Sequence, residues 1–144
     1  MVSDVERTFE VEAPIEKVWE LIADPTKRAE AISVVESYSD EGDEFIWQLE
    51  LPIPVINETV TVRTQDVRRT PPEYVKFVGR SKVMEVTGEH ILESTDTGCQ
   101  VTNRFVVNGK VPGVEKFFQK RIDEEIDNLF QMLEDEFAAE PADG

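Results

Sequence analysis

The sequence predicts an α+β domain in which a curved antiparallel sheet of seven strands wraps around a long C-terminal helix. Apolar and polar residues alternate with a period of two in a first segment and in six more between about residues 34 and 108. After Val111-Pro112-Gly113 the period changes to 3.6, which is typical of an amphipathic helix. These elements can bury their apolar faces together only if the sheet curls and the helix lies on its concave side.

The N-terminal part contains one strand and two short helices. Residues 5–11 alternate and leave one face wet, which predicts the first strand. A helix follows, with Pro14 in its first turn, apolar residues three and four positions apart, and an end near Asp24. Asp24 is placed to cap a second short helix that has Pro25 in its first turn.

Turn-forming residues divide the middle of the chain into six strands. Clean alternation defines an inward face for residues 45–51, 86–92 and 101–107. Around Val60 and Val62 the two faces are equally regular, so the inward face of that strand stays open. The breaks between strands fall at residues 40–43, 52–57, 70–72, 81–82 and 95–98.

The last predicted element is a helix from Val114 to about Ala139. Its apolar residues fall in one stripe about 80° wide. At 1.5 Å per residue the helix is roughly 40 Å long, so it must lie across a broad surface. Counted at 100° per residue from Val114, the stripe contains Phe118, Ile122, Ile126, Leu129 and Leu133. We expect one domain over residues 1–140 and a short tail at residues 141–144.

The charge balance excludes several classes of partner. The 144 residues carry 15 Lys and Arg against 31 Asp and Glu, a net charge of −16 that repels phosphate backbones and anionic lipid surfaces. We therefore expect no nucleic-acid partner and no stable membrane insertion. Because we find no secretion signal and no membrane-spanning run, we expect a cytoplasmic protein. As its oligomeric state we expect a monomer or a weak homodimer.

The residues used in metal and cofactor chemistry are too few to predict a site. Cys99, the single cysteine, cannot form an internal disulfide, and with the single histidine, His90, it cannot make a Cys/His zinc cluster. The sequence shows no calcium loop, no glycine loop for phosphate and no nucleophile elbow. We expect no metal and no cofactor, and we assign no catalytic residue.

Three short motifs carry a resemblance to a known superfamily. They are residues 9–19 (FEVEAPIEKVW), residues 23–25 (ADP) and residues 111–113 (VPG). The chain resembles the helix-grip fold of the START and birch-pollen-allergen superfamily, also called SRPBCC or polyketide cyclase-like proteins, over nearly its whole length. Among the members it is similar to the group named after an accessory protein of carbon monoxide dehydrogenase. The resemblance implies a cavity between sheet and helix, and a function that ranges from lipid carriage to cyclisation.

Three polar residues interrupt faces that are otherwise apolar. With the strand order that the resemblance implies, Arg7, His90 and Asn103 lie on adjacent strands. Glu125, inside the apolar stripe of the last helix, is a candidate partner for Arg7, unless Arg121 holds it at the edge of the stripe. These groups are either the polar end of a ligand pocket, in which Arg7 binds an acidic oxygen of the ligand, or residues with a structural role only. In the second case Arg7 lies near the sheet edge and reaches solvent.

The other predicted pocket residues are apolar. Trp47 lies on an inward face, as a wall of the pocket or as plain core, and Phe118 and Ile122 face the sheet from the helix. The loop at residues 51–56 is apolar and contains two prolines. It either lines a cavity mouth or meets a partner, or it lies on its own core.

We therefore expect a non-catalytic binding or carrier protein that encloses a hydrophobic small molecule or lipid between the sheet and the long helix. Two alternatives from other classes remain. The first is a cyclase, dehydratase or hydrolase that uses His90 with Glu125 or Arg7 in the same cavity. The second is an accessory factor of a larger complex, which would bind through the proline loop and the exposed side of the helix.

The acidic excess predicts a salt-dependent fold and a salt-loving, haloarchaeal source. Self-repulsion of the net charge destabilises the folded chain in dilute buffer, and concentrated salt screens it. We expect the melting temperature to rise by roughly 5 °C or more between low-salt buffer and molar KCl. Circular dichroism during heating measures this, and equal melting temperatures in the two buffers would contradict the prediction.

Overall fold

A computed structural model of the chain describes residues 2–54, 56 and 58–138, and it confirms the predicted fold class. One antiparallel sheet of seven strands has the order β1-β7-β6-β5-β4-β3-β2. The tail expected at residues 141–144 lies outside the described residues. The elements are β1 (Val2–Val11), α1 (Ile15–Ile22), α2 (Pro25–Ala31), β2 (Val35–Asp40), β3 (Phe45–Leu49), β4 (Val60–Thr70), β5 (Tyr74–Arg80), β6 (Met84–Ser94), β7 (Cys99–Gly109) and α3 (Val114–Ala138).

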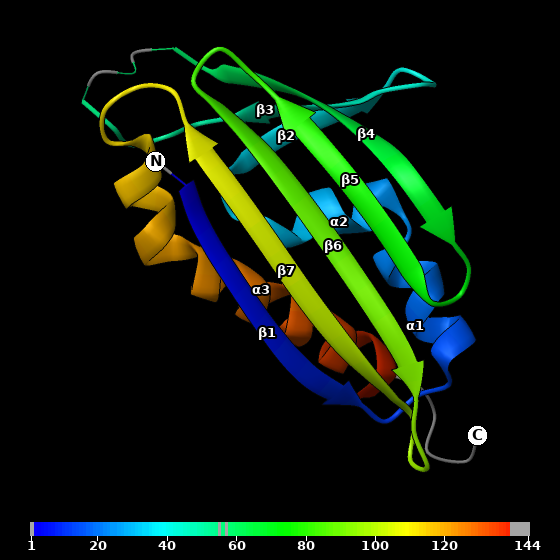
Figure 1. Cartoon of the computed structure of the whole chain (residues 1–144). Coiled ribbons are helices and arrows are strands. Elements are labelled where there is room, and N and C mark those ends of the chain that lie inside the picture. The colour runs from blue at the N-terminus through cyan, green and yellow to red at the C-terminus, as the bar shows by residue number, and fades with distance from the viewer. Residues whose placement is uncertain (1, 55, 57, 139–144) are drawn as a thin grey trace.

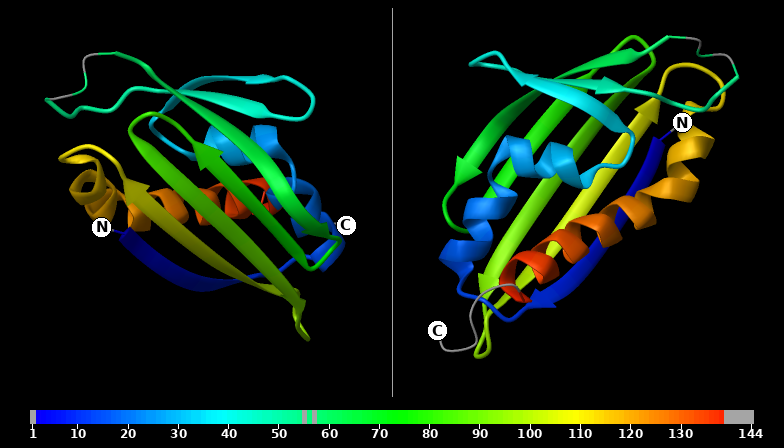
Figure 2. Two further views of the ribbon diagram at one scale, coloured as in Figure 1. Left: turned by 45° about the horizontal axis from the view of Figure 1, so that its top comes forward. Right: turned by 180° about the vertical axis from the view of Figure 1, so that it is seen from behind.

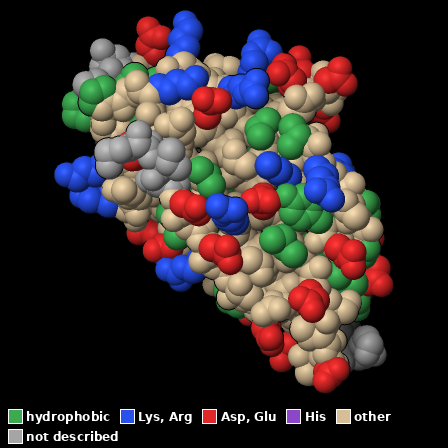
Figure 3. Space-filling view, in the orientation of Figure 1, with side chains coloured by type: hydrophobic (Ala, Val, Ile, Leu, Met, Phe, Trp, Pro, Cys, Tyr) green, Lys and Arg blue, Asp and Glu red, His purple; other side chains and the backbone are tan. Residues whose placement is uncertain are grey.

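All three helices lie on the same, concave face of the sheet (Figures 1 and 2). α3 packs along β1 and β7, α1 contacts β6, and α2 contacts both β2 and α3. The opposite face of the sheet carries charged side chains of both signs among scattered apolar ones (Figure 3). Within the described residues, no helix combines the length and the apolar character that crossing a bilayer requires. The core therefore lies between the sheet and the helices.

The start of α2 follows the predicted capping chemistry. The side chain of Asp24 accepts a hydrogen bond from the backbone N–H of Thr26 at 2.9 Å, and Pro25 occupies the first turn. Because α2 has only one and a half to two turns, this cap and its packing decide where it begins. The cap sets the position of Arg28, one turn further along.

The inward face of β4, which the sequence pattern leaves open, is the face that carries Val60, Val62 and Thr64. Thr61 and Arg63 are exposed. The Thr64 hydroxyl donates to the carbonyl oxygen of Phe45 at 2.5 Å, so this buried polar group has a partner.

Gly88 in β6 permits a close approach that shapes the interior. It lies opposite Phe77 of β5, and a Cβ atom added to Gly88 would lie 2.1 Å from the Phe77 ring. Only glycine therefore lets this ring lie across β6 without a shift. The ring of Phe77 can then reach the middle of the concave face.

The loop between β3 and β4 packs on the core of the chain itself. Leu51 and Ile53 are buried in the same apolar cluster as Phe118 of α3, whereas Pro52 and Pro54 are exposed. This arrangement is the one expected if the loop covers its own core. Val55, which the expected segment also contains, lies outside the described residues.

Candidate functional site

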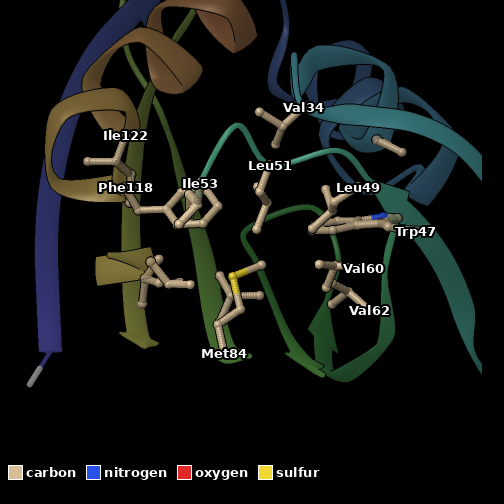
Figure 4. Close-up of a cluster of buried hydrophobic side chains, with 14 of the residues drawn as sticks. Val34, Trp47, Leu49, Leu51, Ile53, Val60, Val62, Met84, Phe118 and Ile122 are labelled. Carbon is tan, nitrogen blue, oxygen red and sulfur yellow. The ribbon is translucent and has the colours of Figure 1, made fainter. Parts of the chain in front are cut away.

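A cavity lies between the concave face of the sheet and the helices α2 and α3. Its walls are apolar apart from Arg28, His90 and Glu125. Side chains from β3, β6, α3 and the loop after β3 point toward one another in this region (Figure 4). The apolar lining includes Trp47 and Leu49 of β3, Phe77 of β5, Met84 and Val86 of β6, Phe105 and Val107 of β7, and Phe118, Ile122 and Leu129 of α3.

The cavity is small in this structure. Its free volume is about 60 Å³, which is room for a few water molecules. Pockets that hold drug-sized ligands have about 300–1,000 Å³. Most of the space that the sequence predicts between sheet and helix is therefore filled by side chains, and a larger ligand must displace some of them.

An ion-pair cluster forms one polar end of the cavity. Arg28 Nη2 lies 2.6 Å from Asp66 Oδ1, and Arg69 Nη1 lies 2.7 Å from Asp66 Oδ2. The Arg28 side chain is 6% exposed and that of Asp66 is 15% exposed. Arg69 also donates to the carbonyl oxygen of Ala23 at 2.9 Å. The cluster thus connects α2 and Ala23, the residue that ends α1, to β4.

Arg28 remains a buried cation that Asp66 compensates. Burial lowers the pKa of Arg28, and the charge and hydrogen bond of Asp66 oppose this shift. The guanidinium also lies over the ring of Phe77, 5.0 Å from its centre. Arg28 Nη1 has no hydrogen-bond partner among the described residues.

His90 is the second polar group on the wall, and it is 1% exposed. It lies opposite Asn103 in the pairing of β6 with β7, and its Nδ1 is 2.8 Å from Asn103 Oδ1. Its ring stacks at 22° on Phe77 and meets Phe105 edge-on. Within the described part of the chain, His90 Nε2 has no hydrogen-bond partner.

His90 is neutral at pH 7. Burial, followed by the nearby charge of Arg28, lowers its pKa from 6.5 to about 4. A neutral imidazole that donates Nδ1–H to the Asn103 carbonyl oxygen keeps a free lone pair on Nε2. The wall of the cavity therefore presents one charged donor, on Arg28, and one neutral acceptor, on His90.

Glu125 lines the cavity from α3 but has a structural partner. Its carboxylate accepts two hydrogen bonds from Ser33, one from the backbone N–H at 2.8 Å and one from the hydroxyl. The guanidinium of Arg121 instead lies over the ring of Phe117. Because Ile32, next to Ser33, also lines the cavity, this contact ties the segment after α2 to α3 beside the cavity.

The prediction that Arg7 is a buried pocket residue paired with Glu125 is wrong. Arg7 Nη2 forms an ion pair with Asp123 of α3 at 2.9 Å, and the Arg7 side chain is 51% exposed. β1 is an edge strand, so a long side chain on its helix-facing side reaches solvent past α3. The arginine of the cavity is Arg28.

Five of the predicted residues do line the cavity. Asn103 is fully buried and lies beside His90 on the neighbouring strand β7, but it does not line the cavity. Arg28 and Asp66 were not predicted. Asp66 continues the inward series of Val60, Val62 and Thr64, so the alternation of β4 could have found it once the inward face was known. The five are Trp47, His90, Phe118, Ile122 and Glu125.

Comparison with known proteins supports the fold. A family model described as polyketide cyclase / dehydrase and lipid transport matches residues 3–134. A search of curated proteins found no match. The aromatase/cyclase Zhui of Streptomyces sp. R1128 is similar with a TM-score of 0.75 at 16% identity, covering 100% of this chain and 99% of that one.

Two further solved structures share the architecture. A conserved protein from Geobacillus kaustophilus has a TM-score of 0.72 at 20% identity, over 96% of this chain and 95% of that one. A START superfamily protein from Mycobacterium smegmatis has a TM-score of 0.73 at 12% identity, over 92% and 95% of the two chains. At these identities the likeness concerns the fold alone.

The lowered pKa of His90 predicts acid sensitivity. In the unfolded chain the imidazole binds a proton near pH 6.5, whereas in the folded chain it does so only near pH 4. Protonation therefore favours the unfolded chain, and the unfolding free energy falls as the pH decreases from about 6.5 toward 4. Between pH 7 and pH 5.5 we expect a loss of about 1 kcal/mol. We expect His90→Gln, which cannot titrate, to lose less stability than the parent over this interval.

Chemical denaturation of both proteins at the two pH values measures the difference. Because His90 is the single histidine of the sequence, no second imidazole contributes to the change. Equal losses of unfolding free energy in the parent and in His90→Gln would show that the imidazole is not held neutral.

Breaking the buried ion pair should be costly. Asp66→Ala leaves the Arg28 guanidinium buried without its carboxylate, so we expect the unfolding free energy to fall by about 3–5 kcal/mol. The matched control is Glu44→Ala, which removes the partner of Arg63 from an exposed pair at 2.7 Å. That change should cost less than about 1 kcal/mol. Similar losses for the two variants in urea denaturation would disprove the structural role of Asp66.

Proposed function

Because the chain belongs to the polyketide cyclase / dehydrase and lipid transport family, we propose that it binds an apolar small molecule or lipid in the cavity between the sheet and α3. The proposed role is that of a carrier, which leaves its ligand chemically unchanged. The observation that carries the proposal is the cavity between the sheet and the helices, whose apolar walls come from four strands and two helices.

The ligand gains space by displacing side chains. Met84 is an unbranched side chain with three rotatable bonds, and it forms part of the cavity wall. Phe118 reaches the cavity from the first turns of α3, where the loop with Leu51 and Ile53 covers it (Figure 4). Rotation of these side chains enlarges the cavity without breaking a strand pairing, and the ligand stabilises the enlarged form.

The chemistry of the wall favours binding over catalysis. An efficient general base has a pKa near the operating pH, and the pKa of His90 is about 4. Glu125 already accepts two hydrogen bonds from Ser33, and Arg7 lies outside the cavity. The alternative function, a cyclase or dehydratase, draws its support from the neutral imidazole of His90 beside the Arg28 guanidinium.

A neutral fluorescent probe, N-phenyl-1-naphthylamine, tests the proposed binding site. Val86→Phe fills the cavity from β6, so we expect the probe to bind at least about tenfold more weakly. Met84→Ala removes volume from the wall, so we expect tighter binding. The matched control is Val106→Phe, because Val106 lies on the other face of β7 from Val107 and should not affect the probe.

Titrations of the four proteins are compared after circular dichroism has verified that each is folded. Mass spectrometry of the denatured parent protein identifies any ligand retained through purification. If neither Val86→Phe nor Met84→Ala changes the affinity for the probe, the cavity is not the binding site. Turnover of a polyketide-like substrate that His90→Ala abolishes would establish the enzymatic alternative instead.

A further inference from the structure

The cavity contains two buried polar atoms without partners. Arg28 is 6% exposed and His90 is 1% exposed, and both line the same cavity. Among the described residues, neither Arg28 Nη1 nor His90 Nε2 has a hydrogen-bond partner. Buried polar groups in proteins are nearly always hydrogen-bonded, because an unsatisfied one costs the free energy of its lost hydration. Two such atoms, one from α2 and one from β6, in one cavity point to a ligand group that satisfies both.

The two atoms have opposite hydrogen-bonding character. A guanidinium only donates, so Arg28 Nη1 requires an acceptor. The Asn103 amide oxygen lies 2.8 Å from His90 Nδ1 and can only accept, so the proton of the neutral ring belongs on Nδ1 and Nε2 is left as an acceptor that requires a donor. Both groups contact the ring of Phe77, the guanidinium at 5.0 Å and the imidazole at 6.3 Å from its centre. They therefore belong to one end of the cavity.

We infer that the ligand carries a hydroxyl group, which accepts a hydrogen bond from Arg28 Nη1 and donates one to His90 Nε2. This inference rests on the proposed binding function. A hydroxyl is the smallest group that both accepts and donates. An ether or ketone oxygen satisfies Arg28 and leaves His90 without a donor.

A carboxylate fits this end of the cavity less well. Asp66 already lies 2.6 Å from Arg28 Nη2, so it balances the charge of the guanidinium and occupies one of the two terminal nitrogens. One of the N–H groups through which an arginine makes a two-pronged contact to a carboxylate is therefore already used by Asp66. A carboxylate oxygen would also face the lone pair of His90 Nε2, which is a repulsive contact.

Four naphthalenes with one variable substituent test the inference. They are 2-naphthol, 2-methoxynaphthalene, 2-naphthoate and 2-methylnaphthalene, each used to displace N-phenyl-1-naphthylamine from the parent protein and from Met84→Ala. We expect 2-naphthol to bind about tenfold more tightly than the other three. In Arg28→Met and in His90→Leu, both checked for folding by circular dichroism, this preference should fall to within about twofold.

The apolar member of the series distinguishes failure of the hydroxyl inference from failure of the proposed function. If 2-methylnaphthalene does not bind, the proposed function itself fails. If it binds as tightly as 2-naphthol in the parent protein, the cavity binds apolar molecules but the hydroxyl inference is wrong. A preference for 2-naphthoate would likewise overturn the inference and would assign Arg28 to an anionic group. Because these outcomes are read from the parent protein, they stand even if a variant does not fold.

Discussion

The ion pair between Arg28 and Asp66 determines how the helical layer sits on the sheet at the polar end of the interior. A buried guanidinium without a carboxylate is far too costly, so α2 can pack only where Arg28 reaches β4. The same side chain covers the ring of Phe77, and that ring lies across β6 because Gly88 has no side chain. The position of α2 then places Ser33 against Glu125 of α3. The need to pair the buried charge of Arg28 with Asp66 thus fixes the position of α2 against β4 and of the cavity wall beside them.

The protonation state of the interior follows from that cluster. Arg28 adds to the effect of burial on His90, so the imidazole stays neutral even though its surroundings contain a carboxylate, Asp66. The protein as a whole is strongly acidic, with a net charge of −16, whereas among the described residues the charged groups at the cavity are two guanidinium groups, of Arg28 and Arg69, and two carboxylates, of Asp66 and Glu125. A molecule that enters the cavity therefore passes from a strongly acidic exterior to an interior whose charges balance.

Much of the fold could be predicted from the sequence, because the change from a period of two to a period of 3.6 records which faces are buried. His90 and Glu125 were found by the same reasoning, as polar breaks in apolar faces. Arg7 shows the limit of this reasoning: the alternation assigns its side chain to the inward face but does not reveal that β1 is an edge strand, from which a long side chain reaches solvent. Arg28 could not be found in this way, since α2 is too short to define an apolar stripe.

The pairing of β1 with β7 has a consequence for synthesis. Val11 lies opposite Cys99, so the N-terminal strand meets its neighbour only after most of the polypeptide has left the ribosome. Until then its apolar side, with Phe9 and Val11, has neither a hydrogen-bonded partner nor the cover of α3. Contacts between such distant segments form late, because closing a long loop must precede them. During synthesis the chain therefore exposes an incomplete sheet with an uncovered apolar face. Such a state is prone to aggregation.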